Sequence, residues 1–363
     1  MRDPKQLILA SKPFASEVRW LSWWHLLSTL AIFVGLIVLS CTTLPLGLRV
    51  LTSVLAGLVQ VRLFILYHDF QHGTILRDSK IAHGIMFMYG MLALNPPSIW
   101  NRSHNHHHKN NAKIFGADIG SYPMMTTEAY ASASAKERFL YSLARHPLTI
   151  AGGYVTIFLY GMCLRSLFIN PRKHYDSAVS IVSHLSLAIW LGYMAWDWLV
   201  LGLVVPCSVA AAFGSYLFYC QHNYPDVKLR DSSQWSYVFA ALHSSSYTKM
   251  SRLMHWFSGN IGYHHVHHLN AHIPFYRLPE AMAGIQELQS PGTTSLRPRD
   301  VFACLRLKLW DVEHDRLVPF PSSAKLAQLM KSAHAVADDR RVRRRLLTSR
   351  LRRQQPQSQR SDH

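Results

Sequence analysis

The chain has 363 residues, of which 49% are apolar and only 16% are charged, whereas about 25% of the residues of ordinary soluble domains are charged. Its mean hydropathy is +0.03 and its formal charge is +18. These values exclude an acidic disordered chain and argue against an ordinary soluble cytosolic enzyme. They predict membrane segments that alternate with polar ones. Histidine is unusually abundant at 22 residues, roughly two to three times its ordinary share.

The composition changes along the chain in three stages. Residues 1–19 are polar and predict a cytoplasmic N-terminal segment, residues 20–320 predict one membrane domain, and residues 321–363 predict a basic, disordered tail. Within that tail, residues 340–363 contain nine arginines and one aspartate, a net charge of +8. No aromatic residues interleave with these arginines, so we expect the tail to contact anionic lipid or solvent rather than nucleic acid.

Four apolar runs are long enough to cross the hydrocarbon core, which takes about 20 residues. They are Trp20–Leu44 and Leu46–Tyr67 in a first hairpin, and Ile181–Leu199 and Val200–Gln221 in a second. We expect the second hairpin to turn through Gly202 and Pro206. Lys and Arg are abundant before the first hairpin and after both, which predicts that both termini lie in the cytoplasm. The predicted fold class is an all-α integral membrane protein with interfacial helices and a cytoplasmic helical cap.

Two further apolar stretches, Ala82–Pro97 and Leu148–Ile169, are predicted to be interfacial or re-entrant. The first is short for a span, and the second contains Gly152, Gly153 and Arg165. Histidine clusters flank both stretches. If these clusters form one site, an even number of membrane crossings must separate them, so neither stretch should cross alone.

Eight histidines fall into three clusters. They are His68 and His72 in HDFQH, His104, His107 and His108 in HNHHH, and His264, His267 and His268 in HHVHH. Positions i, i+3 and i+4 share one face of a helix, so each cluster can direct two or three imidazoles at one point. The pattern HxxHH is expected by chance about 0.08 times in such a chain, yet it occurs twice.

This pattern predicts a metal site, because imidazole binds Fe, Zn, Cu and Ni and is the commonest metal ligand in proteins. Eight nitrogens exceed the ligands that one metal needs, so we expect two metals with roughly three to five protein ligands each. His222, at the end of the fourth span, is a ninth candidate ligand. Asp69 could orient an imidazole, and His106 and His265 could support the ligands beside them. The other eleven histidines, including His25 and His184, lack ligand spacing and receive no role.

The three clusters between two transmembrane hairpins resemble the histidine boxes of integral-membrane fatty acid desaturases. The stretch from Gly259 to Asn270 (GNIGYHHVHHLN), the Gln221–His222 pair and residues 306–311 (RLKLWD) are similar to bacterial acyl-lipid desaturases of the Δ12 type. The resemblance extends from about residue 20 to 320. It implies a diiron centre that uses O₂ to introduce a cis double bond into an acyl chain, with electrons from a ferredoxin or cytochrome b5-type protein.

Carried over by position, the resemblance implies nine iron ligands: His68, His72, His104, His107, His108, His222, His264, His267 and His268. One feature departs from the acyl-CoA desaturases of this superfamily, which have an Asn four residues before the last span's histidine. Here that position is Phe218. The chain has no His-Pro-Gly-Gly haem motif, so the electron donor should be a separate protein, and a basic cytoplasmic face would suit an acidic ferredoxin. The resemblance further suggests a bacterial inner membrane.

The residues leave three functions open. The first is desaturation, and the second is a sister chemistry on the same scaffold: acyl or carotenoid hydroxylation, ketolation, or decarboxylation to an alkene. The third is a membrane metal transporter or sensor, although transporters hold their ligands near the bilayer midplane rather than at span ends. An enzyme acting on lipid should have an apolar tunnel at the metal site, which Phe70, Trp100 or Tyr263 could line. Regiospecificity, acyl carrier and oligomeric state stay open.

Overall fold

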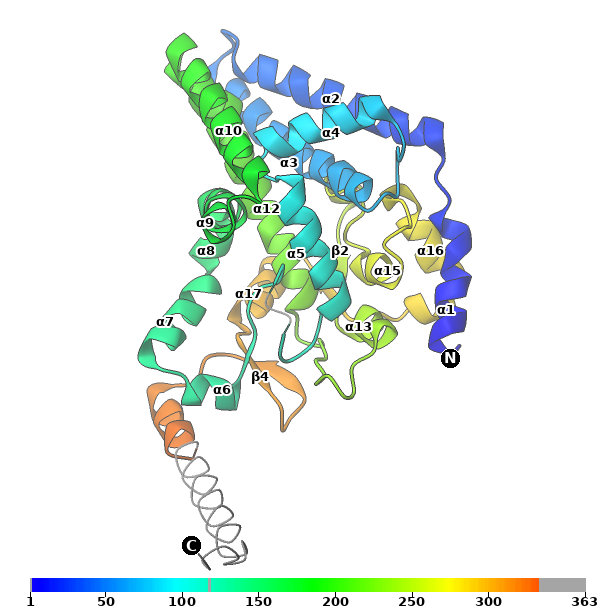
Figure 1. Cartoon of the computed structure of the whole chain (residues 1–363), viewed down its shortest axis with the longest axis vertical. Coiled ribbons are helices and arrows are strands. Elements are labelled where there is room, and N and C mark those ends of the chain that lie inside the picture. The colour runs from blue at the N-terminus through cyan, green and yellow to red at the C-terminus, as the bar shows by residue number, and fades with distance from the viewer. Residues whose placement is uncertain (1, 117–118, 333–363) are drawn as a thin grey trace, which may run out of the picture.

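A computed structural model describes residues 2–116 and 119–332 of the chain (Figure 1). Four of its helices are long and apolar enough to cross a membrane. They are α2 (Arg19–Ser40), α3 (Leu46–Gln71), α10 (Tyr175–Met194) and a continuous helix Trp196–His222 made of α11 (Trp196–Leu199), η3 (Val200–Val204) and α12 (Val205–His222). The predicted all-α membrane fold is confirmed. The predicted tail over residues 333–363 lies outside the described residues.

The second hairpin turns at a different place from the one predicted. Its turn lies at Ala195, whose backbone is extended at φ −166° and ψ 134°. Gly202 and Pro206 lie within the following helix, where η3 is a π-helical turn. Proline has no backbone N–H and cannot make the usual helical hydrogen bond. The π turn changes the hydrogen-bond spacing just before Pro206, so the helix continues through this residue. The third span is therefore shifted towards the N-terminus relative to Ile181–Leu199.

The two shorter apolar stretches form shorter helices. α4 (Lys80–Leu92) has 13 residues, and the π helix η2 (Tyr154–Leu164) continues into α9 (Arg165–Ile169) as an apolar helix shorter than the four spans. α4 packs against both α3 and α10. The prediction that neither stretch spans agrees with these lengths.

The remaining helices lie outside the four spans, and those that follow α12 in the sequence are called the cap. They are α1 (Pro4–Ser11), η1 (Lys12–Ala15), α5 (Pro97–Asn110), α6 (Thr127–Ser132), α7 (Ala135–Ala144), α8 (Pro147–Ala151), α13 (Tyr237–His243), α14 (Arg252–Phe257), α15 (His264–Leu269), η4 (Phe275–Arg277), α16 (Leu278–Gly284), η5 (Gln286–Leu288) and α17 (Pro298–Arg306). Two small sheets join distant segments. β4 (Leu309–Asp311) pairs with β1 (Met125–Thr126) and β5 (Arg316–Val318), and β2 (Tyr247–Lys249) pairs with β3 (Thr293–Ser295).

One of the buried hydrophobic clusters joins the membrane helices to the cap. It contains Leu63 and Leu66 of α3 together with Val266 and Leu269 of α15. α3 is central because it packs against both α2 and α12, and its approach to α12 depends on Gly57. A Cβ at that position would lie 2.8 Å from the carbonyl oxygen of Pro206.

A buried arginine ties the first hairpin to the cap. Arg62 of α3 donates to the carbonyl oxygen of Trp256 at 2.6 Å and to Thr29 Oγ1 at 3.2 Å, and it lies over the Trp256 ring. Its Nη2 also lies 3.1 Å from Nδ1 of His25. His25, which the sequence left without a role, therefore belongs to this contact.

Both ends of the described chain are ordered against the rest of the protein. Leu7 of α1 is fully buried in the core, and Ser11 accepts a hydrogen bond from Asn270, the residue after α15, at 2.9 Å. Residues 323–332 are helical, and Leu326 packs beside Tyr130. The helical structure thus extends past residue 320, where the basic tail was expected to begin.

Candidate metal centre

The nine predicted ligands lie on four helices whose ends meet. His68 and His72 lie in the last turn and at the C-cap of α3, and His222 is the last residue of α12. α5 and α15 carry the other six (Figure 1). In both α5 and α15 the i, i+3, i+4 spacing places three imidazoles on one face, as the sequence predicted.

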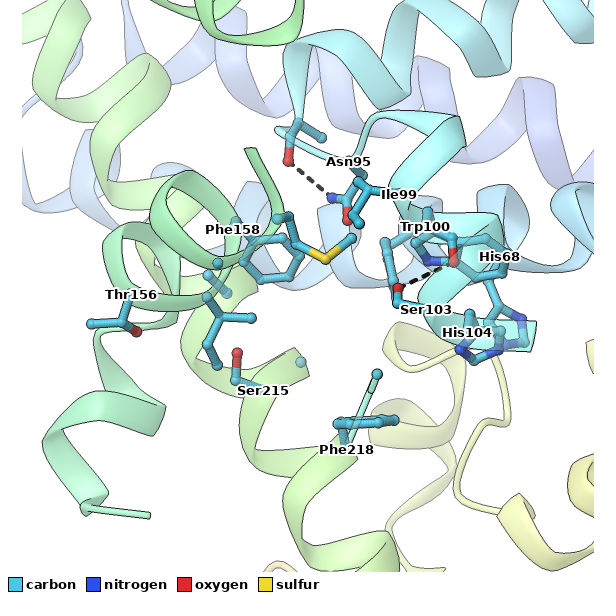
Figure 2. Close-up of a pocket in the computed structure, with 18 of the residues that line it drawn as sticks. His68, Asn95, Ile99, Trp100, Ser103, His104, Thr156, Phe158, Ser215 and Phe218 are labelled. Carbon is cyan, nitrogen blue, oxygen red and sulfur yellow. Dashed lines mark hydrogen bonds between the residues drawn. The ribbon is translucent and has the colours of Figure 1, made fainter. Parts of the chain in front are cut away.

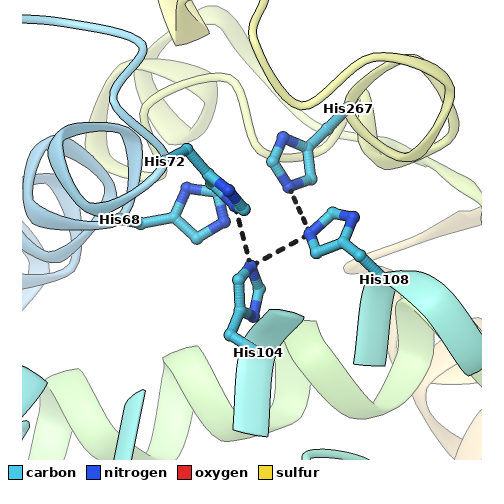
Figure 3. Close-up of side chains that lie close together, drawn as sticks. All are labelled: His68, His72, His104, His108 and His267. Atoms are coloured by element: carbon cyan, nitrogen blue, oxygen red, sulfur yellow. Dashed lines mark hydrogen bonds between the residues drawn. The ribbon is translucent and has the colours of Figure 1, made fainter. Parts of the chain in front are cut away.

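The structure brings all nine histidines together in two groups. Within each group, one ring nitrogen per residue lies within 4.8 Å of that of every other member. The first group, shown in Figure 3, is His68, His72, His104, His108 and His267. The second group is His107, His222, His264 and His268. Their convergence requires an even number of crossings between the second and third clusters, and α10 and the helix Trp196–His222 supply two.

In the first group, the Nε2 atoms of four rings form a chain of short contacts. Nε2 of His104 is 3.0 Å from Nε2 of His72 and 3.0 Å from Nε2 of His108 (Figure 3). Nε2 of His108 is in turn 3.1 Å from Nε2 of His267. His68 completes the group, its ring centroid 4.6 Å from that of His72 and 4.6 Å from that of His267.

In the second group, the Nε2 atoms form a closed four-membered arrangement. Nε2 of His107 lies 3.0 Å from that of His222 and 3.2 Å from that of His268. Nε2 of His264 lies 2.9 Å from that of His222 and 3.1 Å from that of His268. Each ring therefore faces two others through the same nitrogen.

For His222 and His68, the partner of the other ring nitrogen indicates which atom carries the proton. His222 donates from Nδ1 to the carbonyl oxygen of Ser244 at 3.0 Å, and His68 donates from Nδ1 to Asp69 Oδ1 at 3.0 Å. A neutral imidazole has one N–H, so Nε2 of both rings carries a lone pair. Lone pairs directed at a common point repel one another unless a cation lies between them. This arrangement therefore suits a metal ion.

Burial keeps these rings neutral. Desolvation lowers the pKa of His72 to about 3, with a smaller effect from His272. Desolvation, followed by the neighbouring imidazoles, lowers the pKa of His104 well below its usual 6.5. The same causes lower the pKa values of His107, His108, His264, His267 and His268. A neutral imidazole is the form that binds a metal.

The composition of the groups indicates which metals fit. Both groups consist of imidazoles alone, with no carboxylate or thiol among their members. Imidazole suits Fe, Zn, Cu and Ni, whereas Mg²⁺ and Ca²⁺ prefer oxygen ligands. Two groups of five and four nitrogens fit two transition-metal ions.

Asp69 lies where an orienting carboxylate is needed. It is fully buried, accepts from His68 through Oδ1, and accepts from the backbone N–H of Phe275 through Oδ2 at 2.7 Å. The second contact fixes the carboxylate against the cap. Asp69 therefore determines both the tautomer and the ring orientation of His68.

His106 and His265 point away from the two groups. His106 donates to the carbonyl oxygen of Gly116 at 3.1 Å near the surface. His265 is fully buried and donates to the carbonyl oxygen of Leu288 at 3.0 Å. Each of these hydrogen bonds links the histidine's own helix to a neighbouring segment. Neither of them is made to an imidazole of the two groups.

Two contacts of the site have no sequence signal. Ser121 Oγ lies 2.7 Å from Nδ1 of His107, and the Ser244 carbonyl contacts His222. The partners are 14 and 22 residues apart, so no helical spacing predicts them. Phe218 packs its ring against His107 and His222, with centroid distances of 5.0 and 5.8 Å. The position at which acyl-CoA desaturases have an Asn is therefore occupied here by an apolar ring that packs against two of the predicted ligands.

A cavity of about 670 Å³ reaches the histidines from between α3, η2 and α12 (Figure 2). His68, His104 and His264 line it, and apolar side chains such as Phe158 and Phe218 form much of its wall. Other lining residues include Ile65, Trp100, Ile157, Met162, Ala211 and Leu217. The predicted tunnel thus has a counterpart, and Trp100 lines it as expected. The rings of Phe70 and Tyr263 instead contact His83 and Tyr247.

These features define a class: a helical membrane protein with two histidine groups that could hold metal ions beside an apolar cavity. The sequence profile described as fatty acid desaturase matches residues 44–297. The chain belongs to the fatty acid desaturase family and is an oxidoreductase.

Relatives agree with this assignment. A protein named fatty acid desaturase from Bacillus subtilis (strain 168) is 29% identical over 326 residues, covering 87% of this chain and 90% of its own length. The sn-1 oleoyl-lipid 12-desaturase of Synechocystis sp. is 23% identical over 279 residues, covering 75% of this chain and 77% of its own. The sn-1 acyl-lipid omega-3 desaturase (ferredoxin) of Nostoc sp. (strain 36) is 24% identical over 230 residues, covering 62% of this chain and 63% of its own.

Proposed function

We propose that the protein introduces a cis double bond into a fatty acyl chain at a diiron centre. The proposed ligands are His68, His72, His104, His108 and His267 for one iron and His107, His222, His264 and His268 for the other. The observation that supports this most strongly is the division of nine buried imidazoles into two groups at one apolar cavity. Neutral imidazoles suit iron, and the cavity volume of about 670 Å³ lies in the usual range for ligand sites.

The proposed reaction balances as a four-electron reduction of O₂. Two neighbouring methylenes each lose one hydrogen atom, a donor protein supplies two electrons, and solvent supplies two protons. O₂ becomes two water molecules and the acyl chain gains a double bond. The bound irons would supply the O₂-dependent oxidation of an unactivated C–H bond, which acid–base side chains cannot perform.

The chain's own residues position the substrate and protect the site. The cavity wall holds the methylenes beside the imidazoles and excludes water. Asp69 fixes the His68 ring, and Phe218 closes the wall next to His107 and His222. Asp69 acts on the reaction through His68 and is a positioning residue.

We further propose that the electrons come from a separate ferredoxin or cytochrome b5-type protein. The Nostoc relative carries ferredoxin in its name. The distribution of Lys and Arg supports a cytoplasmic site with both termini on the same side. The similarity to bacterial desaturases supports a bacterial inner membrane. In this arrangement residues 1–19 are a cytoplasmic segment and residues 20–320 form the membrane domain.

Analysis of total fatty acids by gas chromatography and mass spectrometry tests the function. Host cells would express the native chain, His107→Ala or His106→Ala at equal protein level, together with a ferredoxin. We expect a new unsaturated acid with the native chain and with His106→Ala, but none with His107→Ala. His106 is the matched control because it lies beside His107 and donates to Gly116 instead.

The products separate desaturation from its rivals. Hydroxy acids or terminal alkenes that depend on His107 would replace desaturation by a sister chemistry on the same centre. If lipids stay unchanged in cells that supply iron and donor, acyl oxidation is wrong. Carotenoid oxidation and metal handling would then be tested by carotenoid analysis and by uptake of radioactive metal.

A further inference from the structure

The charges on the cavity wall are all of one sign. Arg102 and Arg165 are the only charged side chains among the described residues that line the cavity, and no aspartate, glutamate or lysine lies there with them. Both arginines are exposed at the surface as well. They therefore mark a place where the cavity meets its surroundings, and the positive potential there is not cancelled by a lining carboxylate.

A buried chain of hydrogen bonds holds Arg102 in place. Its Nη1 lies 3.2 Å from Nε2 of His174, and Nδ1 of His174 lies 2.9 Å from Ser98 Oγ. Ser98 Oγ donates in turn to Asp176 Oδ1 at 2.6 Å, and the Ser98 backbone N–H donates to Oδ2 at 2.8 Å. His174 is fully buried and Asp176 nearly so.

The hydrogen bonds from Arg102 through His174 and Ser98 to Asp176 form a relay, and the chemistry of Arg102 determines which atoms in it donate. A guanidinium can only donate, so Nε2 of His174 accepts and Nδ1 carries the proton that His174 donates to Ser98. The carboxylate of Asp176 is thus separated from Arg102 by two neutral groups. The relay orients the guanidinium without neutralising it directly, which leaves its remaining N–H groups available for an anion.

Arg165 is a second cation among the residues that line the cavity. In the described part of the chain no carboxylate lies within 4.0 Å of its side-chain nitrogens. Arg165 begins α9, and backbone hydrogen bonds from Asn170 to Ser166 and from His174 to Asn170 link this helix to the relay. Arg165 therefore belongs to the same segment as His174.

The two arginines lie at the level expected for lipid head groups. His174 immediately precedes α10, which begins at Tyr175 and is one of the four candidate spans. Residues at the start of a membrane-spanning helix lie at the interface, where phosphates of the bilayer are found. An acyl chain that enters from this level can keep its head group at the interface while its methylenes occupy the apolar cavity.

We propose that Arg102 and Arg165 bind the phosphate of a membrane glycerophospholipid whose acyl chain occupies the cavity. This inference rests on the proposed function, because it names the carrier of the acyl chain that is desaturated. Ser98, His174 and Asp176 position Arg102 for this contact. The head group is recognised by charge-assisted hydrogen bonds, and the chain by its apolar surface.

Lipid binding to the metal-free full-length protein tests the inference without catalysis. The probes are phosphatidylglycerol, diacylglycerol with the same acyl chains and an acyl-CoA, each titrated in detergent micelles. We expect phosphatidylglycerol affinity to fall about tenfold or more in Arg102→Gln and in Arg165→Gln, the loss of a charge-assisted contact to phosphate. Arg172→Gln is the matched control, an exposed arginine nearby that does not line the cavity, and should bind as the native chain does.

Further variants separate a site from a folding defect. Arg165→Lys keeps the charge and should retain most of the affinity, and thermal unfolding should show that all variants fold. Ser98→Ala, which breaks the relay, should weaken binding less than Arg102→Gln. The inference is wrong if both glutamine variants bind phosphatidylglycerol normally, if diacylglycerol binds as tightly as phosphatidylglycerol, or if the acyl-CoA is preferred.

Measurements of activity show whether the proposed phosphate site or the proposed function is wrong. With iron and donor supplied, the glutamine variants should raise KM for the phospholipid and change kcat little, because the phosphate contact lies away from the reacting carbons. A native chain that forms no double bond on any acyl carrier refutes the proposed function. A native chain that is active, with variants of unchanged KM, refutes only the phosphate site.

Discussion

At the scale of single residues, Asp69 is the clearest test of how the site is built. Its two oxygens connect His68 to the backbone of Phe275, so it joins a proposed ligand of α3 to the cap. We expect Asp69→Asn to keep the fold but to weaken the orientation and basicity of His68. Loss of such a partner typically costs about 10–100-fold in metal affinity. Iron per protein, measured after dialysis against graded chelator, should fall accordingly.

The control for this substitution is Asp226→Asn, which makes the same chemical change at an exposed position. It should retain iron as the native protein does. Equal iron retention in Asp69→Asn and Asp226→Asn would show that the carboxylate of Asp69 does not support the metal.

Spacing predicted which histidines meet, but not how they divide. His104, His107 and His108 share one helical face, and the sequence placed them in one cluster on that ground. In the structure His107 joins the second group while its two neighbours join the first. The division depends on where α5 lies relative to α3, α12 and α15, whose histidines its own rings contact. Helical periodicity within α5 does not specify that position. The relay from Arg102 to Asp176 escaped the sequence for the same reason, because its partners lie more than seventy residues apart.

At the scale of secondary structure, α3, whose C-terminal end carries His68 and His72, packs against α12, which ends at His222. Gly57 permits that contact: an added Cβ would lie 2.6 Å from Val209 Cβ as well as close to a backbone oxygen. We expect Gly57→Ala to destabilise the protein by about 1–3 kcal/mol, the usual cost of overpacking. Thermal unfolding in detergent, followed by tryptophan fluorescence, should show a lower Tm.

Gly47→Ala in the same helix is the control, since nothing lies within 4 Å of a Cβ there. Alanine is the better helix former, so this variant should be neutral or more stable. A Gly57→Ala protein as stable as Gly47→Ala would mean that the helices do not approach as closely as described.

The hairpins show what apolar runs predict and what they leave out. The four runs identified the number of spans, because length and hydropathy determine whether a helix can cross a bilayer. The turn of the second hairpin was placed wrongly at Gly202 and Pro206, because glycine and proline are common in the turns of soluble proteins. Within a membrane, a π turn and neighbouring helices satisfy the backbone, so the helix continues. The turn lies instead at Ala195.

At the scale of the whole molecule, the protein buries many imidazoles in neutral form, and this predicts how acid affects it. In the unfolded chain these rings protonate near pH 6.5. In the metal-free fold, burial lowers the pKa of His265 to about 4 and that of His72 to about 3. Between these values the unfolded state binds more protons, so the free energy of unfolding decreases as the pH falls from about 6.5 to 4.

Thermal unfolding of chelator-treated protein across this pH range measures the effect. The slope should approach about 1.4 kcal/mol per pH unit for each such ring, and the loss should be complete below the folded pKa values. Iron-loaded protein is the comparison, because a ligated nitrogen cannot take up a proton until the metal leaves. Its Tm should lie above that of metal-free protein and fall with a similar slope down to about pH 4, because in both folded states the rings bind no protons while the unfolded chain binds them. Coinciding Tm values for loaded and metal-free protein across this range would mean that iron does not bind the folded site, and the assignment of the nine ligands would be wrong.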